Sequence, residues 1–119
     1  MGLAAVVDRG FRSEFRLRKT DEFSSVFAFR RSVRSLSFEL LYRPAAGGSA
    51  RLGIVVAKKH VRSAVSRNLI KRIVRESFRL MRTQLVRRDI VVRVRTRIAM
   101  VNRRSLRDEI NSLFLGLAQ

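Results

Sequence analysis

The chain has 119 residues, of which 46% are hydrophobic, and this length and composition suit one compact domain with its own core. Its 27 Lys and Arg against nine Asp and Glu give a formal charge of +18, spread along the whole chain, which favours nucleic acid over a membrane surface as partner. Cysteine is absent, which excludes disulfides and thiolate metal sites. Arg greatly outnumbers Lys, and a planar guanidinium both grips phosphate and stacks on bases, which favours RNA.

Residues 1–15 mix glycine with scattered charges and show no period, so we expect a flexible basic N-terminal arm ahead of a single RNA-binding α+β domain at 16–119. The apolar run at 3–7 is too short for a signal sequence. No run approaches the roughly 18 apolar residues of a membrane span. We therefore expect a cytoplasmic protein with no membrane partner.

The first predicted element is a short helix over about residues 20–29. Thr20 can cap it, its first turn is acidic, and Phe23, Val26 and Phe27 recur at helical spacing. Two Phe side chains four residues apart on a helix are by default core packing, and this alternative stays open for Phe23 and Phe27.

Two strands are expected next. Apolar residues alternate from Leu36 to Tyr42, as in a half-buried strand, and Pro44 with the Gly47–Ser49 cluster ends it in a loop. The short, β-branched run Leu52–Ala57 predicts a second strand that is buried on both faces. We expect these two strands to form a hairpin.

A long amphipathic helix is predicted between Val65 and Leu85, because apolar residues recur there at helical spacing. Its other faces carry Lys and Arg against one acid, Glu76. Like charges four residues apart repel by a few tenths of a kcal/mol per pair, which a polyanion would offset. A merely solvated basic face is the alternative, but ordinary exposed helices intersperse the two signs.

The remaining pattern predicts a third strand and a final helix. Residues 89–95 alternate, with a basic second face, and Asn102 or Ser105 can cap the helix that follows, Ser105 with Asp108 in a capping box. The order helix, strand, strand, helix, strand, helix predicts a two-layer α+β sandwich with a small mixed sheet.

Residues 51–79, RLGIVVAKKHVRSAVSRNLIKRIVRESFR, resemble the signature of the bacterial ribonuclease P protein family: a strand, a Lys-Lys turn and a helix that opens with RNxxKRxxR at 67–75. Leu69 stands where the family usually has a second Arg. Residues 17–27 are similar to the family's first helix, so the resemblance covers about residues 16–117. It implies a ribosomal-protein-S5-domain-2-like fold with a left-handed crossover.

The resemblance also implies a function. The protein would be a non-catalytic subunit that binds the catalytic RNA of ribonuclease P and helps to remove the 5′ leader of precursor tRNA, with Mg²⁺ held by the RNA. Binding of the RNA subunit is then expected at the turn and the long helix, through Lys58, Lys59, Arg62, Arg67, Asn68, Lys71, Arg72, Arg75 and Arg79.

The resemblance further implies that the leader binds in a cleft between the first helix and the sheet, at Phe23, Phe27, Phe38, Arg18 and Lys19. The family often has a cleft Tyr on the following strand. Leu41 occupies that position here, and Tyr42 is expected to face the other way.

Three other functions compete with this interpretation. A structural ribosomal protein that binds rRNA shares the size and charge, and a DNA-binding regulator would use residues 65–82 as a recognition helix but lacks a preceding short helix at the required spacing. An independent nuclease centre has little support, because His60 is the only histidine and the acidic pairs lie where helix capping explains them. We expect no metal bound by the protein, no catalytic residue of its own and no small-molecule substrate.

Overall fold

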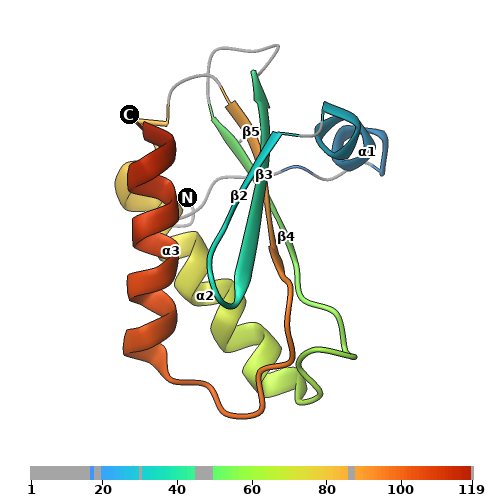
Figure 1. Ribbon diagram of the computed structural model, residues 1–119, viewed down its shortest axis with the longest axis vertical. Coiled ribbons are helices and arrows are strands. Elements are labelled where there is room, and N and C mark those ends of the chain that lie inside the picture. The colour runs from blue at the N-terminus through green and yellow to red at the C-terminus, as the bar shows by residue number, and fades with distance from the viewer. Residues whose placement is uncertain (1–16, 18–19, 30, 45–49, 86–87, 119) are drawn as a thin grey trace, which may run out of the picture.

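The computed structural model describes residues 17, 20–29, 31–44, 50–85 and 88–118. The expected arm at 1–15 lies outside this part of the chain. In chain order the elements are α1 (Thr20–Phe29), β2 (Arg31–Arg34), β3 (Phe38–Pro44), β4 (Arg51–Val55), α2 (Ala64–Met81), β5 (Arg88–Val94) and α3 (Arg103–Ala118) (Figure 1).

The four strands form one mixed sheet in the order β2-β3-β5-β4. β3 is antiparallel to both β2 and β5, whereas β4 and β5 are parallel neighbours that the chain joins through α2. This arrangement confirms the predicted α+β fold class with a small mixed sheet. No helix within the described ranges is both long and apolar enough to cross a membrane.

The expected hairpin between the strands predicted at Leu36–Tyr42 and Leu52–Ala57, which correspond to β3 and β4, is wrong, because β5 lies between them. Ile90, Val91 and Val92 of β5 are all 0% exposed, and a strand covered on both faces belongs in the middle of a sheet. β4, expected to be buried on both faces, is instead an edge strand whose Val55 is 36% exposed.

The hairpin that does form joins β3 to β2, a strand that the sequence did not predict. Its residues, RSVR, contain a single apolar side chain, Val33, and so carry no alternation to detect. β3 starts at Phe38, later than expected, because Ser35 to Ser37 form the bend of this hairpin and leave Leu36 78% exposed.

Helices α2 and α3 pack side by side on one face of the sheet, and α1 lies on the other (Figure 1). Phe78 of α2 and Phe114 of α3 meet edge to face, with ring centroids 6.2 Å apart, at the centre of the main core. The strands alternate accordingly: Leu40 and Val92 face this core, whereas Leu41 and Val91 face α1.

Side-chain caps fix where the two long helices begin. The Ser63 hydroxyl accepts a hydrogen bond from the Ser66 amide at the start of α2. Asn102 does the same for α3, accepting from the Ser105 amide at 3.0 Å, so the alternative capping box that begins at Ser105 is wrong. α2 ends at Met81, short of the predicted end, and a turn follows.

Candidate nucleic-acid interface

Helix α2 presents its cations away from the core, as its sequence predicted. Ile70, Ile73, Val74, Ser77 and Phe78 are its buried residues. The opposite side, hereafter the basic face, consists of exposed or half-buried residues: Arg67, Asn68, Lys71, Arg72, Arg75 and Arg79.

Several of these cations make no ion pair with an acid in the described part of the chain. Within the described part of the chain, the ion pairs involve Glu39 and Asp89, both on the sheet, and none involves the following cations of the basic face and the preceding turn: Lys58, Lys59, Arg62, Arg67, Lys71, Arg72 and Arg79. Their positive charge is therefore available to an external anion.

Arg67 has a second role, in holding the turn that precedes α2. Its Nη1 donates hydrogen bonds to the carbonyl oxygens of Val61 at 3.0 Å and Arg62 at 2.7 Å. The same turn is tied to the β5–α3 connection, where the Ile98 amide donates to the His60 carbonyl at 2.9 Å. The segment Lys58–Arg62, hereafter the basic turn, is thus fixed relative to the helix.

A second, smaller core lies between α1 and the sheet. Leu17, Val26, Leu41 and Val91 are buried there, and the half-buried rings of Phe23 and Phe27 pack against them. Leu41 thus lies on the α1 side, where the sequence placed it, and Tyr42 packs into the main core on the other face.

The structure corrects one predicted leader-binding residue. Phe38 is 0% exposed in the main core, because it shares the alternation of Leu40 and faces α2 and α3 rather than α1. Arg18 and Lys19 lie outside the described residues.

The ring of Phe23 rests on the backbone of Gly53 in β4. A Cβ atom at Gly53 would lie 2.5 and 2.6 Å from two of its ring carbons. The same residues line a hollow of about 150 Å³, hereafter the α1 hollow, whose wall includes Lys71 and Arg75 of the basic face. The structure therefore brings a predicted leader-binding residue next to predicted RNA-subunit-binding residues.

The α1-facing side of the sheet has ion pairs on either side of this apolar contact. At one end Asp89, 0% exposed, accepts hydrogen bonds from Arg43 and Arg51 on the two neighbouring strands, each at 3.0 Å. At the other end Glu39 lies between Arg34 on β2 and Arg93 on β5. Each carboxylate thus joins three adjacent strands.

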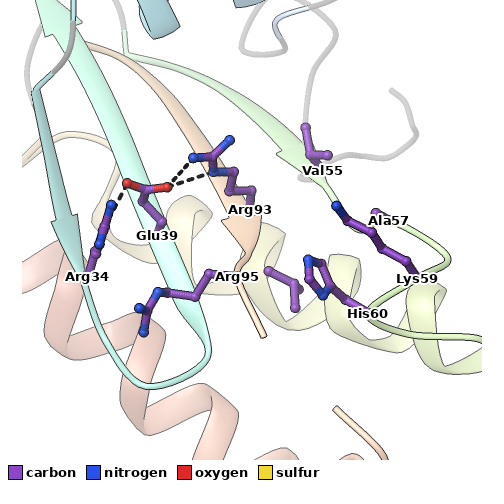
Figure 2. Close-up of a pocket in the computed structure, with 9 residues that line it drawn as sticks. Arg34, Glu39, Val55, Ala57, Lys59, His60, Arg93 and Arg95 are labelled. Atoms are coloured by element: carbon purple, nitrogen blue, oxygen red, sulfur yellow. Dashed lines mark hydrogen bonds and ion pairs between the residues drawn. The ribbon is translucent and has the colours of Figure 1, made fainter. Parts of the chain in front are cut away.

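Glu39 borders a larger hollow in the sheet, of about 460 Å³, hereafter the sheet hollow (Figure 2). The residues that line it come from four segments of the chain: Arg34, Glu39, Val55, Ala57, Lys59, His60, Arg93, Val94 and Arg95. Burial raises the pKa of Glu39, but the hydrogen bonds and charges of Arg93 and Arg34 outweigh it and hold the pKa below the ordinary value of 4.5.

Sequence analysis did not single out Arg34, Glu39, Arg93 or Arg95. The basic second face of residues 89–95 was recognised, but the pairing of Glu39 with Arg34 and Arg93 depends on the register of three strands, one of which was not predicted. Only the alternation of charge along β5 pointed to this side of the sheet.

The described carboxylates do not form a metal site. No group of three or more His, Cys, Asp or Glu side chains lies together in the described ranges. Asp89 and Glu39 bind arginines, and Glu109 accepts hydrogen bonds from the Ser35 hydroxyl at 2.6 Å and the Ser37 amide at 2.8 Å. These three carboxylates therefore already have arginine, hydroxyl or amide donors as partners.

Comparison with known proteins identifies the family. The family model described as Ribonuclease P matches residues 11–118. This chain belongs to the ribonuclease P protein family. It is 50% identical over 107 residues to the ribonuclease P protein component of Aromatoleum aromaticum, with 90% of each chain covered, and 44% identical over 109 residues to that of Chromobacterium violaceum, with 92% of this chain and 90% of the relative covered.

Solved structures agree with this assignment. The ribonuclease P protein of Staphylococcus aureus superimposes with a TM-score of 0.79 at 27% identity, covering 88% of this chain and 95% of that one. The Thermotoga maritima protein, in complex with 1-(4-fluorophenyl)-2-thiourea, gives 0.74 at 33% identity, covering 83% and 96%.

As a member of this family, the protein is a component of ribonuclease P, a ribonucleoprotein endoribonuclease of tRNA processing, and its partner is the ribonuclease P RNA. The comparisons favour this function over the structural ribosomal protein considered above.

Gly53→Ala should destabilise the protein by about 1–3 kcal/mol, because the new methyl group overlaps the Phe23 ring and must displace it. Gly116→Ala is the matched control: it lies in α3 with no atom within 4 Å of the new Cβ, and it should stabilise by about 0.5–1 kcal/mol through helix propensity. Urea unfolding measures both. Equal effects would contradict the close contact of Phe23 with β4.

The ion pairs of Glu39 should make stability depend on pH. Because its folded pKa is lowered, the stabilisation is complete above the ordinary value of 4.5 and is lost as pH falls through the folded pKa. The advantage of the wild type over Glu39→Gln should therefore be constant above about pH 5 and shrink below it. Urea midpoints of both proteins across this range test this, and a difference that does not change with pH would contradict it.

Proposed function

We propose that the basic face of α2 and the basic turn bind the ribonuclease P RNA, and that the 5′ leader of precursor tRNA binds between α1 and the sheet. In this arrangement the protein holds and positions RNA, and the RNA subunit cuts the leader from the tRNA. The observation that carries the proposal is the set of α2 and turn cations without acidic partners, beside half-buried aromatic rings.

The electrostatic cost of the basic face supports an RNA partner. Arg67 and Lys71 are four residues apart, as are Lys71 and Arg75, so positive charges follow one another along one side of the helix. Phosphates placed there would neutralise this repulsion and release condensed counterions, which stabilises the complex. Arg67 would also act indirectly, by holding the basic turn in place.

The burial of the aromatic rings supports the leader site. Phe38, Phe78 and Phe114 are all 0% exposed, as expected for core packing, whereas Phe23 and Phe27 are half-buried at the edge of the smaller core. A partly open ring can stack on a base, and such contacts contribute about 1–3 kcal/mol per base. Arg18 and Lys19, just before α1 in the sequence, would contact the same leader RNA.

The cutting chemistry is assigned to the RNA. Glu39, Asp89 and Glu109 are engaged with arginine or serine donors, so the catalytic Mg²⁺ ions are proposed to bind RNA phosphates rather than this protein. Precursor tRNA as substrate also places the protein in the cytoplasm.

Arg72→Ala should weaken binding of the ribonuclease P RNA and flatten its salt dependence, because one phosphate contact is lost. Each lost contact reduces the slope of log K against log salt by about 0.7–0.9. Arg104→Ala, an exposed cation at the start of α3, is the charge-matched control and should leave the slope nearly unchanged. Filter binding over a salt series measures both. Identical slopes for the two variants would rule out α2 as the RNA-binding face.

Phe23→Leu should weaken binding of leader-bearing precursor tRNA to the reconstituted holoenzyme. Binding of mature tRNA should be unchanged. Leucine keeps an apolar contact with the smaller core but cannot stack on a base. The expected loss is about fivefold or more, the equivalent of 1 kcal/mol. Circular dichroism checks folding, and equal losses for both tRNAs would indicate that Phe23 only packs.

A further inference from the structure

Glu39 is a carboxylate in a hollow that is otherwise basic. The cations that line the sheet hollow are Arg34, Lys59, Arg93 and Arg95, and Glu39 is its only acidic lining residue among the residues described. A negative charge at this place repels phosphate, so it opposes the binding of RNA. A carboxylate at this position therefore needs a specific role that offsets its repulsion of RNA.

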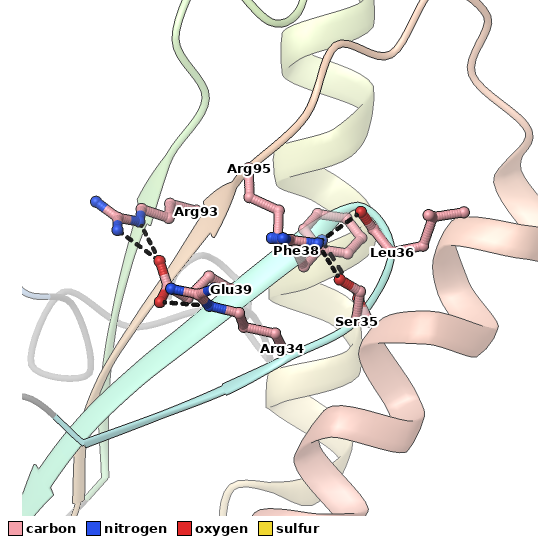
Figure 3. A network of polar contacts seen from close by, with 7 residues as sticks. All are labelled: Arg34, Ser35, Leu36, Phe38, Glu39, Arg93 and Arg95. Atoms are coloured by element: carbon pink, nitrogen blue, oxygen red, sulfur yellow. Dashed lines mark hydrogen bonds and ion pairs between the residues drawn. The ribbon is translucent and has the colours of Figure 1, made fainter.

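Glu39 fixes the orientation of Arg93. One carboxylate oxygen, Oε1, accepts a hydrogen bond from Arg93 Nε at 2.7 Å and lies 2.5 Å from Nη2 (Figure 3). The other oxygen, Oε2, accepts from Arg34 Nε at 3.1 Å. The Glu39 side chain is only 6% exposed, so its contacts with Nε and Nη2 of Arg93 are shielded from water.

Arg93 in turn lies over the ring of Phe27, with Cζ 5.6 Å from the ring centroid. Glu39 therefore holds one edge of the guanidinium, and its carbon atom Cζ lies over the Phe27 ring. The Arg93 side chain remains 43% exposed, and within the described residues no partner engages Nη1. A planar guanidinium with a free face stacks on nucleobases.

This arrangement connects the smaller core under α1 with the sheet hollow. Phe27 belongs to the smaller core under α1, whereas Arg93 lines the sheet hollow. The guanidinium thus extends the aromatic surface from α1 toward the cations of the hollow.

We propose that Glu39 is a positioning residue for the leader: it holds the guanidinium of Arg93 beside Phe27, so that a base stacks on the guanidinium while adjacent phosphates lie over the sheet hollow. The proposal rests on the proposed leader site and adds to it Glu39, a residue whose negative charge would by itself repel RNA. It assigns to single-stranded RNA a binding position on β3 and β5, beyond the rings of α1.

Because Glu39 is negatively charged, the direction of the change in leader affinity on its removal tests the proposal. Removing an acid from an RNA-binding surface strengthens phosphate binding if only the net charge matters. If Glu39 positions Arg93, removing it frees the guanidinium to rotate, and stacking is lost although the net charge has risen. The two roles therefore predict opposite changes in leader affinity.

The experiment compares Glu39→Gln with Glu76→Gln in holoenzyme reconstituted with the ribonuclease P RNA. Both substitutions remove one negative charge, and Glu76 is exposed on α2, outside the sheet hollow. Affinities are measured for mature tRNA and for precursor tRNAs whose leaders lengthen by single nucleotides. Glu39→Gln should weaken precursor binding about fivefold, but only for leaders long enough to reach Arg93, with mature tRNA unchanged or tighter. Glu76→Gln should show no such loss at any leader length.

Arg93→Lys provides an independent variant, because it keeps the charge and removes the planar group that Glu39 orients. It should lose the same step in the leader-length series, and it keeps the proposal testable if Glu39→Gln does not fold. Precursor binding by Glu39→Gln that equals or exceeds that of the wild type would overturn the positioning role while the leader site stands. A wild-type holoenzyme that binds mature and precursor tRNA equally would overturn the leader site and this proposal together.

Discussion

The alternation of side chains along β5 is the constraint on which the structure depends. One set of its residues, Ile90, Val92 and Val94, enters the main core under α2 and α3. The other set, Asp89, Val91 and Arg93, faces α1. Because β5 pairs with strands on both sides, this alternation is transmitted through the register to β3 and β4, and a slip of one residue would exchange a buried core for a charged surface.

Three acidic side chains of the described part hold segments of the fold together. Asp89 and Glu39 each join arginines from two neighbouring strands, and Glu109 fixes the bend between β2 and β3. Desolvation offsets part of the stabilisation that a buried carboxylate between two arginines provides, and the pairing also specifies register and orientation. By contrast, Lys71, Arg72 and Arg79 of α2 make no ion pair with a described acid, so charges are separated: acids organise the sheet, and these cations lie on the outward side of the helix.

Much of the fold could be predicted from the sequence because its helices and its central strand carry clear periods. The stripe Ile70, Val74, Phe78 predicted α2 with its basic side outward, and the motif at 67–75 indicated the family. The order of strands could not be predicted, since a parallel pair joined through a helix places β5 between strands that precede it in the chain. The short strand β2 escaped notice because RSVR has no apolar alternation.

Site residues could be predicted where they belong to a local sequence motif. They could not be predicted where their position depends on the register between strands. The basic face follows from spacing along one helix, whereas the pairing of Glu39 with Arg93 exists only across two strands. The prediction for Phe38 was wrong for the same reason: the sequence did not reveal which side of β3 faces α1, and Phe38 lies on the opposite side, in the main core.

The two proposed RNA-binding surfaces meet at the α1 hollow, and this contact has a mechanical consequence. Lys71 and Arg75 line that hollow together with Phe23 and Gly53, so α2 is both the proposed site for the RNA subunit and a wall of the proposed leader site. Side chains in contact do not act independently, and binding at one surface biases the arrangement of the other. An RNA that ordered Lys71 and Arg75 would therefore also shape the space beside Phe23, and would couple capture of the leader to assembly with the RNA proposed to cut it.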